Sequence, residues 1–230
     1  MITIRKSKDR GTAEHDWLQT KHSFSFANYY DPTHMGFRSL RVINEDVIAG
    51  GGGFPPHPHE NMEIITYIIS GELEHKDSMG TGSVIKAGEV QYMSAGTGVV
   101  HSEFNHSAHR PLHLLQIWLL PNEFGAGPRY DQQTIKPADI KNQLGLIASG
   151  GEGGINVRQD MKLYACKLTT DQTVDYRLEV GRALWLQLIS GKLLVGGQSA
   201  NAGDGVRVER EDSLRINAIK DAHFILFDLE

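Results

Sequence analysis

The sequence predicts an all-β protein built from two related barrels, with little helix. Alternation of apolar and polar residues, as expected for strands, is common along the chain, whereas helical periodicity is scarce. Short strand-like segments recur at close intervals with Gly, Asn or Pro between them, a spacing that favours a sandwich or barrel. One segment also repeats, since Ile69-Ser-Gly-Glu-Leu73 returns as Ile189-Ser-Gly-Lys-Leu193.

The expected strands follow one another along most of the chain. They cover residues 23–27, 40–44, 64–70, 71–77, 91–94, 112–120, 161–168, 182–190, 192–196, 213–217 and 222–229. The best helix candidate is short, residues 137–143, and begins with a proline, which is acceptable in a first turn. It lies in the least strand-like stretch, residues 121–142, which we interpret as the connection between the two halves. We therefore expect domains at residues 1–130 and 131–230.

Two short motifs in the first half have the residue types and the spacing of a metal site. His57-Pro-His59 and His101-Ser-Glu103 each place two side chains two positions apart. Side chains at i and i+2 of a strand point to the same face, so two neighbouring strands could bring four ligands to one point. Three imidazoles and one carboxylate suit Fe, Mn, Ni, Co, Cu or Zn. They would also leave two positions of an octahedral ion open, as a catalytic site requires.

The context of these motifs resembles the pirin family of the cupin superfamily, with the clearest similarity over roughly residues 15 to 120. The similarity rests on these segments, in order: Leu40-Arg-Val-Ile-Asn44, Gly53-Phe-Pro-Pro-His-Pro-His59, Met62-Glu-Ile-Ile-Thr-Tyr67, His75-Lys-Asp-Ser-Met-Gly80, Met93-Ser-Ala-Gly-Thr-Gly98, His101-Ser-Glu103 and Leu115-Gln-Ile-Trp118. The resemblance implies a bicupin of two jelly-roll domains, with a metal-binding domain at residues 1–130 and a degenerate domain at residues 131–230.

The resemblance also implies an activity and a cofactor. The family's recorded activity is of the quercetin 2,3-dioxygenase type, in which a flavonol is cleaved with O2. One divalent ion per chain is expected, with His57, His59, His101 and Glu103 as ligands. Fe2+ is the expected ion, although Zn, Mn, Ni, Co or Cu would also suit the ligands. Glu103 is the candidate both for the fourth ligand and for the catalytic base.

Two functions of other classes stay open on the sequence. One is a non-enzymatic, iron-binding regulatory protein that acts through a protein partner, as is described for relatives of pirin. The other is a metal-dependent isomerase of the cupin type, with Zn or Mn as Lewis acid. Consumption of O2 would distinguish the oxygenase from the isomerase, and inactivity with every phenol would favour the regulator.

Several other polar and apolar residues have two interpretations. Glu63 is expected to orient the ligands or line the wall rather than to bind metal. Four histidines are expected on the surface or within strands rather than as ligands: His75, His106, His109 and His113. Three apolar residues near the first motif could form a wall that accepts an aromatic ring, or could simply pack in the core: Phe54, Pro56 and Met62. The single cysteine, Cys166, alternates with apolar neighbours and is expected to be a buried thiol.

The repeat extends to a second, looser match, Ala87-Gly-Glu-Val90 with Ala202-Gly-Asp-Gly205. If the ligand positions are carried across by these matches, Arg177 and Glu179 replace the first two histidines. Ile216 and Ala218 would then replace His101 and Glu103. We therefore expect one metal ion per chain, in the first half only.

Composition excludes several classes of function. The 230 residues carry a net charge of −5 with no long run of Lys or Arg, so direct binding to nucleic acid is not expected. No apolar run approaches the length that a membrane span needs. A single cysteine allows no intrachain disulfide, which fits a reducing cytoplasm as the expected location.

Overall fold

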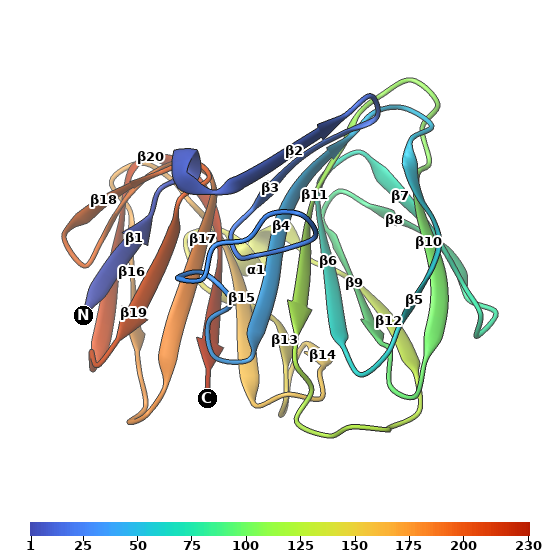
Figure 1. The fold of residues 1–230 in the computed structure, drawn as a ribbon. Coiled ribbons are helices and arrows are strands. Elements are labelled where there is room, and N and C mark those ends of the chain that lie inside the picture. The colour runs from blue at the N-terminus through green and yellow to red at the C-terminus, as the bar shows by residue number, and fades with distance from the viewer. The chain divides into compact units, whose positions relative to one another are not determined.

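The computed structural model describes residues 1–230 and confirms the all-β class (Figure 1). Regular helix is confined to a 3-10 turn, η1 (Ser7–Asp9), and one four-residue helix, α1 (Pro137–Ile140). The chain forms two compact units. The N-terminal unit comprises Gly11–Ile135 and Val157–Gln159, and the C-terminal unit comprises Met1–Arg10, Lys136–Asn156 and Asp160–Glu230. No helix is long and apolar enough to cross a membrane.

The N-terminal unit consists of two sheets. The larger has the strand order β12-β9-β6-β11-β4-β3-β2, and the smaller has the order β5-β10-β7-β8. The bounds are β2 (Gly11–His15), β3 (Leu18–His22), β4 (Leu40–Ile48), β5 (Gly53–His59), β6 (Glu63–Ser70), β7 (Glu72–Asp77), β8 (Gly82–Lys86), β9 (Glu89–Ser94), β10 (Val99–Asn105), β11 (Leu112–Leu119) and β12 (Arg129–Thr134).

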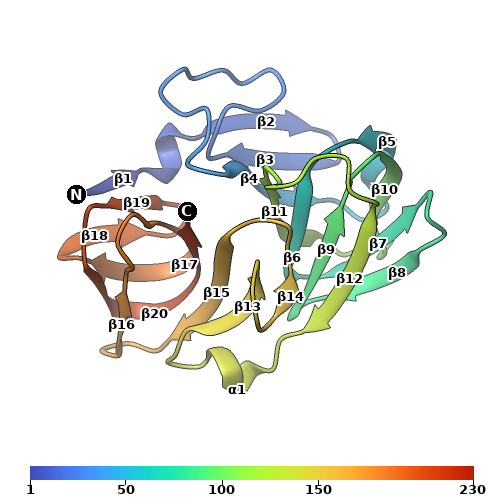
Figure 2. The same cartoon turned by 90° about the horizontal axis from the view of Figure 1, so that it is seen from below.

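The C-terminal unit is one sheet of nine strands that curve around a common interior (Figure 2). Its strands are β1 (Ile2–Arg5), β13 (Gly145–Ser149), β14 (Ile155–Asn156), β15 (Met161–Leu168), β16 (Thr173–Arg177), β17 (Ala183–Val195), β18 (Gln198–Asn201), β19 (Gly205–Glu209) and β20 (Ser213–Leu229). Its interior is a contiguous apolar cluster. Cys166 is part of that cluster, and burial raises the pKa of its thiol to about 12.

The first ten residues lie outside the domain to which we assigned them. β1 pairs antiparallel with β19, from Ile2 opposite Val208 to Arg5 opposite Gly205. The opening segment of the chain therefore belongs to the C-terminal unit. A strand of four residues with one buried side chain gives little sign, in sequence, of which sheet it joins.

Three expected elements differ in the structure. Residues 23–27 form a loop rather than a strand, in which Phe26 and Tyr29 exchange two backbone hydrogen bonds. The stretch 121–142 contains β12, an edge strand whose polar sequence lacks apolar alternation because much of it is exposed. The last four expected strands are two long ones, β17 and β20, which bend at irregularities of register instead of ending.

The strand register corrects the expected correspondence between the two halves. Asn105 lies opposite Leu73, and Ala218 lies opposite Leu193, the residue that repeats Leu73. Ala218 is therefore the counterpart of Asn105. Glu103 lies two residues before Asn105, so its counterpart lies two residues before Ala218, at Ile216.

The same reasoning fixes the counterparts of the histidines. Leu214 is the counterpart of His101, and it lies opposite Tyr176 just as His101 lies opposite His57. Two residues after Tyr176 and just past the end of β16, Leu178 is the counterpart of the second histidine, and its N–H donates to the Asp212 carbonyl oxygen. The alignment by glycine-containing segments was thus wrong by one residue in the first motif and by two in the second.

The corrected positions explain why this unit has no histidine cluster. Leu178, Leu214 and Ile216 are buried in the apolar cluster. Arg177 and Glu179 are exposed, because a shift of one residue moves a side chain to the opposite face of a strand. The C-terminal unit therefore places a tyrosine, Tyr176, at the position of His57 and apolar side chains at the positions of His59, His101 and Glu103.

This register can be tested with two neighbouring residues. Leu178→Ala should lower the free energy of unfolding by about 2–5 kcal/mol, because it removes buried methyl groups from a packed core. Arg177→Ala should change it by no more than about 0.5 kcal/mol, as for most exposed positions. Urea unfolding followed by circular dichroism measures both. Equal effects of the two substitutions would contradict the register.

Candidate metal centre

Three of the four expected ligands come together on β5 and β10. His57 lies directly opposite His101, and His59 lies two residues along the same face of β5. The ring centroids of His57 and His101 are 4.4 Å apart, and the other two pairs are each separated by 4.9 Å. One ligand atom from each ring lies within 4.8 Å of the other two. This is the two-strand arrangement that the spacing of the motifs predicted.

The backbones of β5 and β10 approach each other closely next to the histidines. The register shifts between His101 and Glu103, so that Glu103 pairs with Phe54. At this point a Cβ on Gly53 would lie 2.4 Å from the Glu103 carbonyl oxygen. Only glycine fits there without moving the backbone, which accounts for the glycine at the entry of the first motif.

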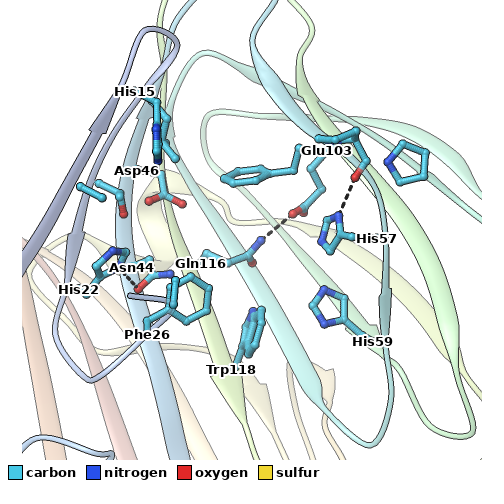
Figure 3. Close-up of a pocket in the computed structure, with 17 residues that line it drawn as sticks. His15, His22, Phe26, Asn44, Asp46, His57, His59, Glu103, Gln116 and Trp118 are labelled. Atoms are coloured by element: carbon cyan, nitrogen blue, oxygen red, sulfur yellow. Dashed lines mark hydrogen bonds between the residues drawn. The ribbon is translucent and has the colours of Figure 1, made fainter. Parts of the chain in front are cut away.

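The fourth expected ligand, Glu103, is buried beside the histidines and is held by amide groups. Gln116 Nε2 donates a hydrogen bond of 2.7 Å to one carboxylate oxygen. Gln91 Nε2 donates one of 3.3 Å to the other, and Thr66 Oγ1 lies 3.4 Å from it. Figure 3 shows the carboxylate on the same side of the pocket as His57. Glu103 also groups with His101 and His75 within 4.8 Å.

The chemistry of the histidine cluster fits a metal ion. Both ring nitrogens of His101 are buried and lack a hydrogen-bond partner, which is rare for buried polar atoms. His57 donates from Nδ1 to the Pro55 carbonyl oxygen at 2.8 Å (Figure 3). This bond leaves the Nε2 atom of His57 unprotonated in the neutral ring, which is the form that binds metal.

Burial also favours the ligand forms of the histidines. Loss of hydration lowers the pKa of His101 to about 2 and that of His59 to about 4, and the charge of His57 lowers both further. Glu103 shows the opposite shift, because burial raises its pKa to about 7. The Gln91 hydrogen bond lowers that pKa and the charge of Asp46 raises it. At neutral pH the imidazoles of His59 and His101 are therefore uncharged and ready to coordinate.

Sequence reasoning missed one residue of this site, His75. It lies on β7 as a strand residue, but it is fully buried and stands opposite Glu103, while Asp77 stands opposite His101. His75 Nε2 donates to the Asp77 carboxylate at 2.9 Å. The other ring nitrogen of His75 is buried without a partner, and its ring centroid is 5.3 Å from that of His101.

A signal for His75 was present in the sequence. His75-Lys-Asp77 has the same i, i+2 spacing as the two recognised motifs, and three such pairs now occupy three adjacent strands. The remaining histidines behave as expected. His106 and His109 are exposed, and His113 pairs with Glu45 at 3.1 Å.

Glu63 does not lie at the centre. Its side chain is buried and accepts hydrogen bonds from the Tyr92 hydroxyl, from Ser94 Oγ at 2.7 Å and from the Arg158 backbone N–H at 3.2 Å. Both oxygens are thus bonded to groups outside the histidine cluster. The expectation that Glu63 orients the ligands or lines the wall was wrong. Its bonds instead attach Val157–Gln159 to the N-terminal unit.

A row of polar residues crosses the inner face of the large sheet beneath Glu103. His22, Asn44, Gln116, Thr66 and Gln91 stand opposite one another on five successive strands. Along the row, His22 Nδ1 is 2.8 Å from Asn44 Oδ1, and Thr66 donates to Gln116 at 2.8 Å. Gln91 donates to Thr66 at 3.2 Å. Because each residue is fixed by its neighbours, the amides that hold Glu103 are themselves held.

A pocket of about 400 Å3 opens beside the cluster and lies wholly within the N-terminal unit. Its apolar lining includes Leu18, Phe26, Phe54, Pro55, Pro56 and Trp118, and its polar lining includes Thr20, His22, Asn44, Asp46, Gln116, His57, His59 and Glu103. Phe54 and Pro56 thus line the pocket, which was one of the two interpretations left open by the sequence. Met62 instead packs against a separate apolar cluster.

A chain of two cupin barrels, one of which carries a histidine cluster able to hold a metal ion, defines the class as a bicupin of the metal-binding type. Within that class, this chain belongs to the pirin family. Residues 3–119 match the family model Pirin, and residues 146–229 match the model described as the quercetinase C-terminal cupin domain.

Close relatives extend over the whole chain. A protein of Escherichia coli K12 named quercetin 2,3-dioxygenase is 46% identical over 229 residues, which cover 100% of this chain and 99% of that protein. The crystal structure of E. coli YhhW has a TM-score of 0.96 and 45% identity, and covers 100% of this chain and 98% of that one. The crystal structure of the same bacterial pirin in complex with nickel(II) has a TM-score of 0.95, 44% identity and coverage of 100% and 99%.

The assignment of Glu63 leads to a stability test. Glu63→Gln should lower the free energy of unfolding by about 1–3 kcal/mol, because buried donors lose their charged acceptor. Metal content of the purified variant should stay at the wild-type level. Urea unfolding and elemental analysis provide the two measurements. A variant of normal stability that has lost its metal would instead identify Glu63 as a ligand.

The lowered pKa of His59 predicts an effect of acid on the metal-free protein. Between pH of about 6.5 and about 4 the unfolded chain protonates this imidazole and the folded chain does not, so acid lowers the free energy of unfolding. Glu103 acts in the opposite direction where its pKa is raised, so wild type must be compared with a variant. His59→Gln should weaken the loss of stability in acid, whereas His109→Gln, at an exposed position, should not. Identical profiles for all three proteins would contradict this assignment.

Proposed function

We propose that the protein is a metal-dependent dioxygenase that cleaves flavonols such as quercetin with O2. The observation that carries this proposal is the juxtaposition of the histidine cluster, a buried carboxylate and an apolar pocket in one unit. A relative named quercetin 2,3-dioxygenase, similar over the full length, supports it. The same similarity favours the oxygenase over the regulatory protein and the isomerase.

We propose one divalent ion per chain, held by His57, His59, His101 and Glu103, with Fe2+ as the native ion. The three imidazoles lie close together, burial lowers the pKa of His59 and of His101, and Glu103 lies beside His101. This donor set accepts most first-row metals, so supply in the cell decides occupancy. A bound ion of this kind provides the Lewis acidity and the one-electron reactivity toward O2 that amino-acid side chains lack.

Glu103 is proposed as the base that accepts the proton of the flavonol 3-hydroxyl. Its carboxylate lines the pocket and is held by the side-chain amides of Gln116 and Gln91. Those amides are fixed by the polar row, so the accepting oxygen needs no reorientation by solvent. A base held in this way typically contributes a factor of about 10² to 10⁴ to the rate.

The pocket walls bind and orient the substrate. Phe26 and Trp118 contact each other edge to face, with ring centroids 5.3 Å apart, and Phe54 closes another part of the wall. Aromatic and proline surfaces of this kind bind flat rings and exclude water. A cavity of about 400 Å3 is within the range that encloses a small polycyclic ligand.

The direct test combines metal analysis with measurement of turnover. Protein purified without oxygen and loaded with Fe2+ should contain about one ion per chain, and should consume O2 in proportion to flavonol lost. His101→Ala should lose both metal and turnover while circular dichroism shows a folded protein. Two ions per chain, or the absence of turnover with a range of flavonols, would refute the proposal.

The role of Glu103 can be separated from that of a nearby buried carboxylate. Glu103→Gln should reduce turnover by a factor of about 10² to 10⁴, because the amide keeps an oxygen but loses its basicity. Glu63→Gln serves as the matched control and should keep turnover near the wild-type value. Flavonol loss and metal content are measured for both variants at equal protein concentration. Near-normal turnover in Glu103→Gln would exclude it as the base.

A further inference from the structure

We propose that Thr20 and Asp46 form a hydroxyl-recognition subsite, which selects flavonols that carry hydroxyl groups on the ring remote from the cleaved heterocycle. This inference rests on the proposed function, because it concerns the specificity of the same pocket. It assigns to the two residues the role of positioning substrate.

The sheet brings the two residues together inside the pocket. Thr20 on β3 lies directly opposite Asp46 on β4, so their side chains are neighbours on one face. Both line the pocket. Figure 3 shows Asp46 across the pocket from Glu103, His57 and His59, with Gln116 between them. A flat ligand with one end at Glu103 therefore presents its other end to this pair.

The burial of the Thr20 hydroxyl beside Asp46 indicates that a ligand, rather than solvent, is the partner of that hydroxyl. Thr20 is 6% exposed and Asp46 is 3% exposed. The Thr20 hydroxyl is buried without a hydrogen-bond partner, although most buried polar atoms have one. The neighbouring Glu45 side chain has its own partner, His113, on the other face of the strand. Of the two adjacent acidic residues on β4, only Asp46 reaches the pocket.

The chemistry of the pair selects the ligand group. An ionised carboxylate only accepts hydrogen bonds, whereas a threonine hydroxyl both donates and accepts. Two adjacent phenolic hydroxyls match this arrangement, one donating to Asp46 and the other exchanging a hydrogen bond with Thr20. An anionic substituent would be repelled by Asp46, and an unsubstituted ring would leave both residues without a ligand partner. The structure thus favours a ring with adjacent hydroxyls over a bare ring.

Three flavonols that differ only in the remote ring provide the test. Quercetin carries two adjacent hydroxyls there, kaempferol one and galangin none. We expect wild type to prefer quercetin to galangin in kcat/KM. Asp46→Asn and Thr20→Val should each reduce that preference by a factor of about 10 or more, because a site built for a hydroxyl discriminates through it. Turnover of galangin by Thr20→Val should change by less than about twofold, whereas Asp46→Asn also removes a charge that raises the pKa of Glu103. Glu45→Gln, the adjacent residue on the other face, should alter none of these values.

Equilibrium binding separates this proposal from the proposed function. The quenching of tryptophan fluorescence by each flavonol is titrated without oxygen on metal-loaded wild type and variants. If wild type turns over flavonols but the variants keep its preference in kcat/KM and in binding, the subsite is refuted and the dioxygenase stands. If wild type turns over none, yet binds quercetin more tightly than galangin in a manner that depends on Asp46, the subsite stands and the dioxygenase falls. Absence of both turnover and binding refutes both.

Folding of the variants is checked by their thermal unfolding midpoints. If Asp46→Asn does not fold, Thr20→Val decides, since it preserves shape and removes only the hydroxyl group. A folded Thr20→Val with an unchanged preference for quercetin would overturn the subsite, and restoration of the preference in Thr20→Ser would support it.

Discussion

The antiparallel register of β10 between β5 and β7 is the constraint on which the site depends. β10 carries His101 and Glu103 on one face, so each neighbouring strand can add residues only at alternate positions. The pairs on β5 and β7 occupy those positions. Six polar side chains therefore meet on one face of the smaller sheet, a position that apolar side chains usually occupy in a protein interior. They are His57, His59, His75, Asp77, His101 and Glu103. Strand geometry, more than any single hydrogen bond, fixes which side chains can approach one another.

The C-terminal unit has the same arrangement of strands but lacks the ligand residues. Its equivalent strands have the same pairing, but Tyr176, Leu178, Leu214 and Ile216 take the four ligand positions, and the last three extend the apolar core. The N-terminal unit buries less apolar surface at these positions, and each of its inward-facing polar groups needs a hydrogen-bond partner. The polar row provides partners for most of them, and His101 is left with none within the chain. A polar interior of this kind is retained for chemistry rather than for stability.

The sequence alone predicted the class of fold, the strand pairs that meet at the cluster and the three histidines, because period-two spacing translates directly into a shared face. The i, i+2 spacing of His75 and Asp77 was a signal for His75, but the burial of this histidine depends on β10, a neighbouring strand distant in sequence. The residue-by-residue alignment of the two halves was wrong for a related reason. Glycine-containing turns mark where strands begin, whereas registers are set by side-chain packing. The role expected for Glu63 was wrong because one of its partners, the backbone N–H of Arg158, follows almost a hundred residues later and could not be identified from the sequence.

The pairing of β1 with β19 has a consequence for the order of folding. β1 is synthesised before every other strand of the structure, yet it pairs with β19, which lies about two hundred residues later. All residues of the N-terminal unit, Val157–Gln159 included, are synthesised before β19. β1 must therefore remain unpaired during most of synthesis, and closing this contact is entropically expensive and slow. β1 has only four residues, and only one of them is buried. While it is unpaired, it therefore does not expose a long apolar strand edge to other chains.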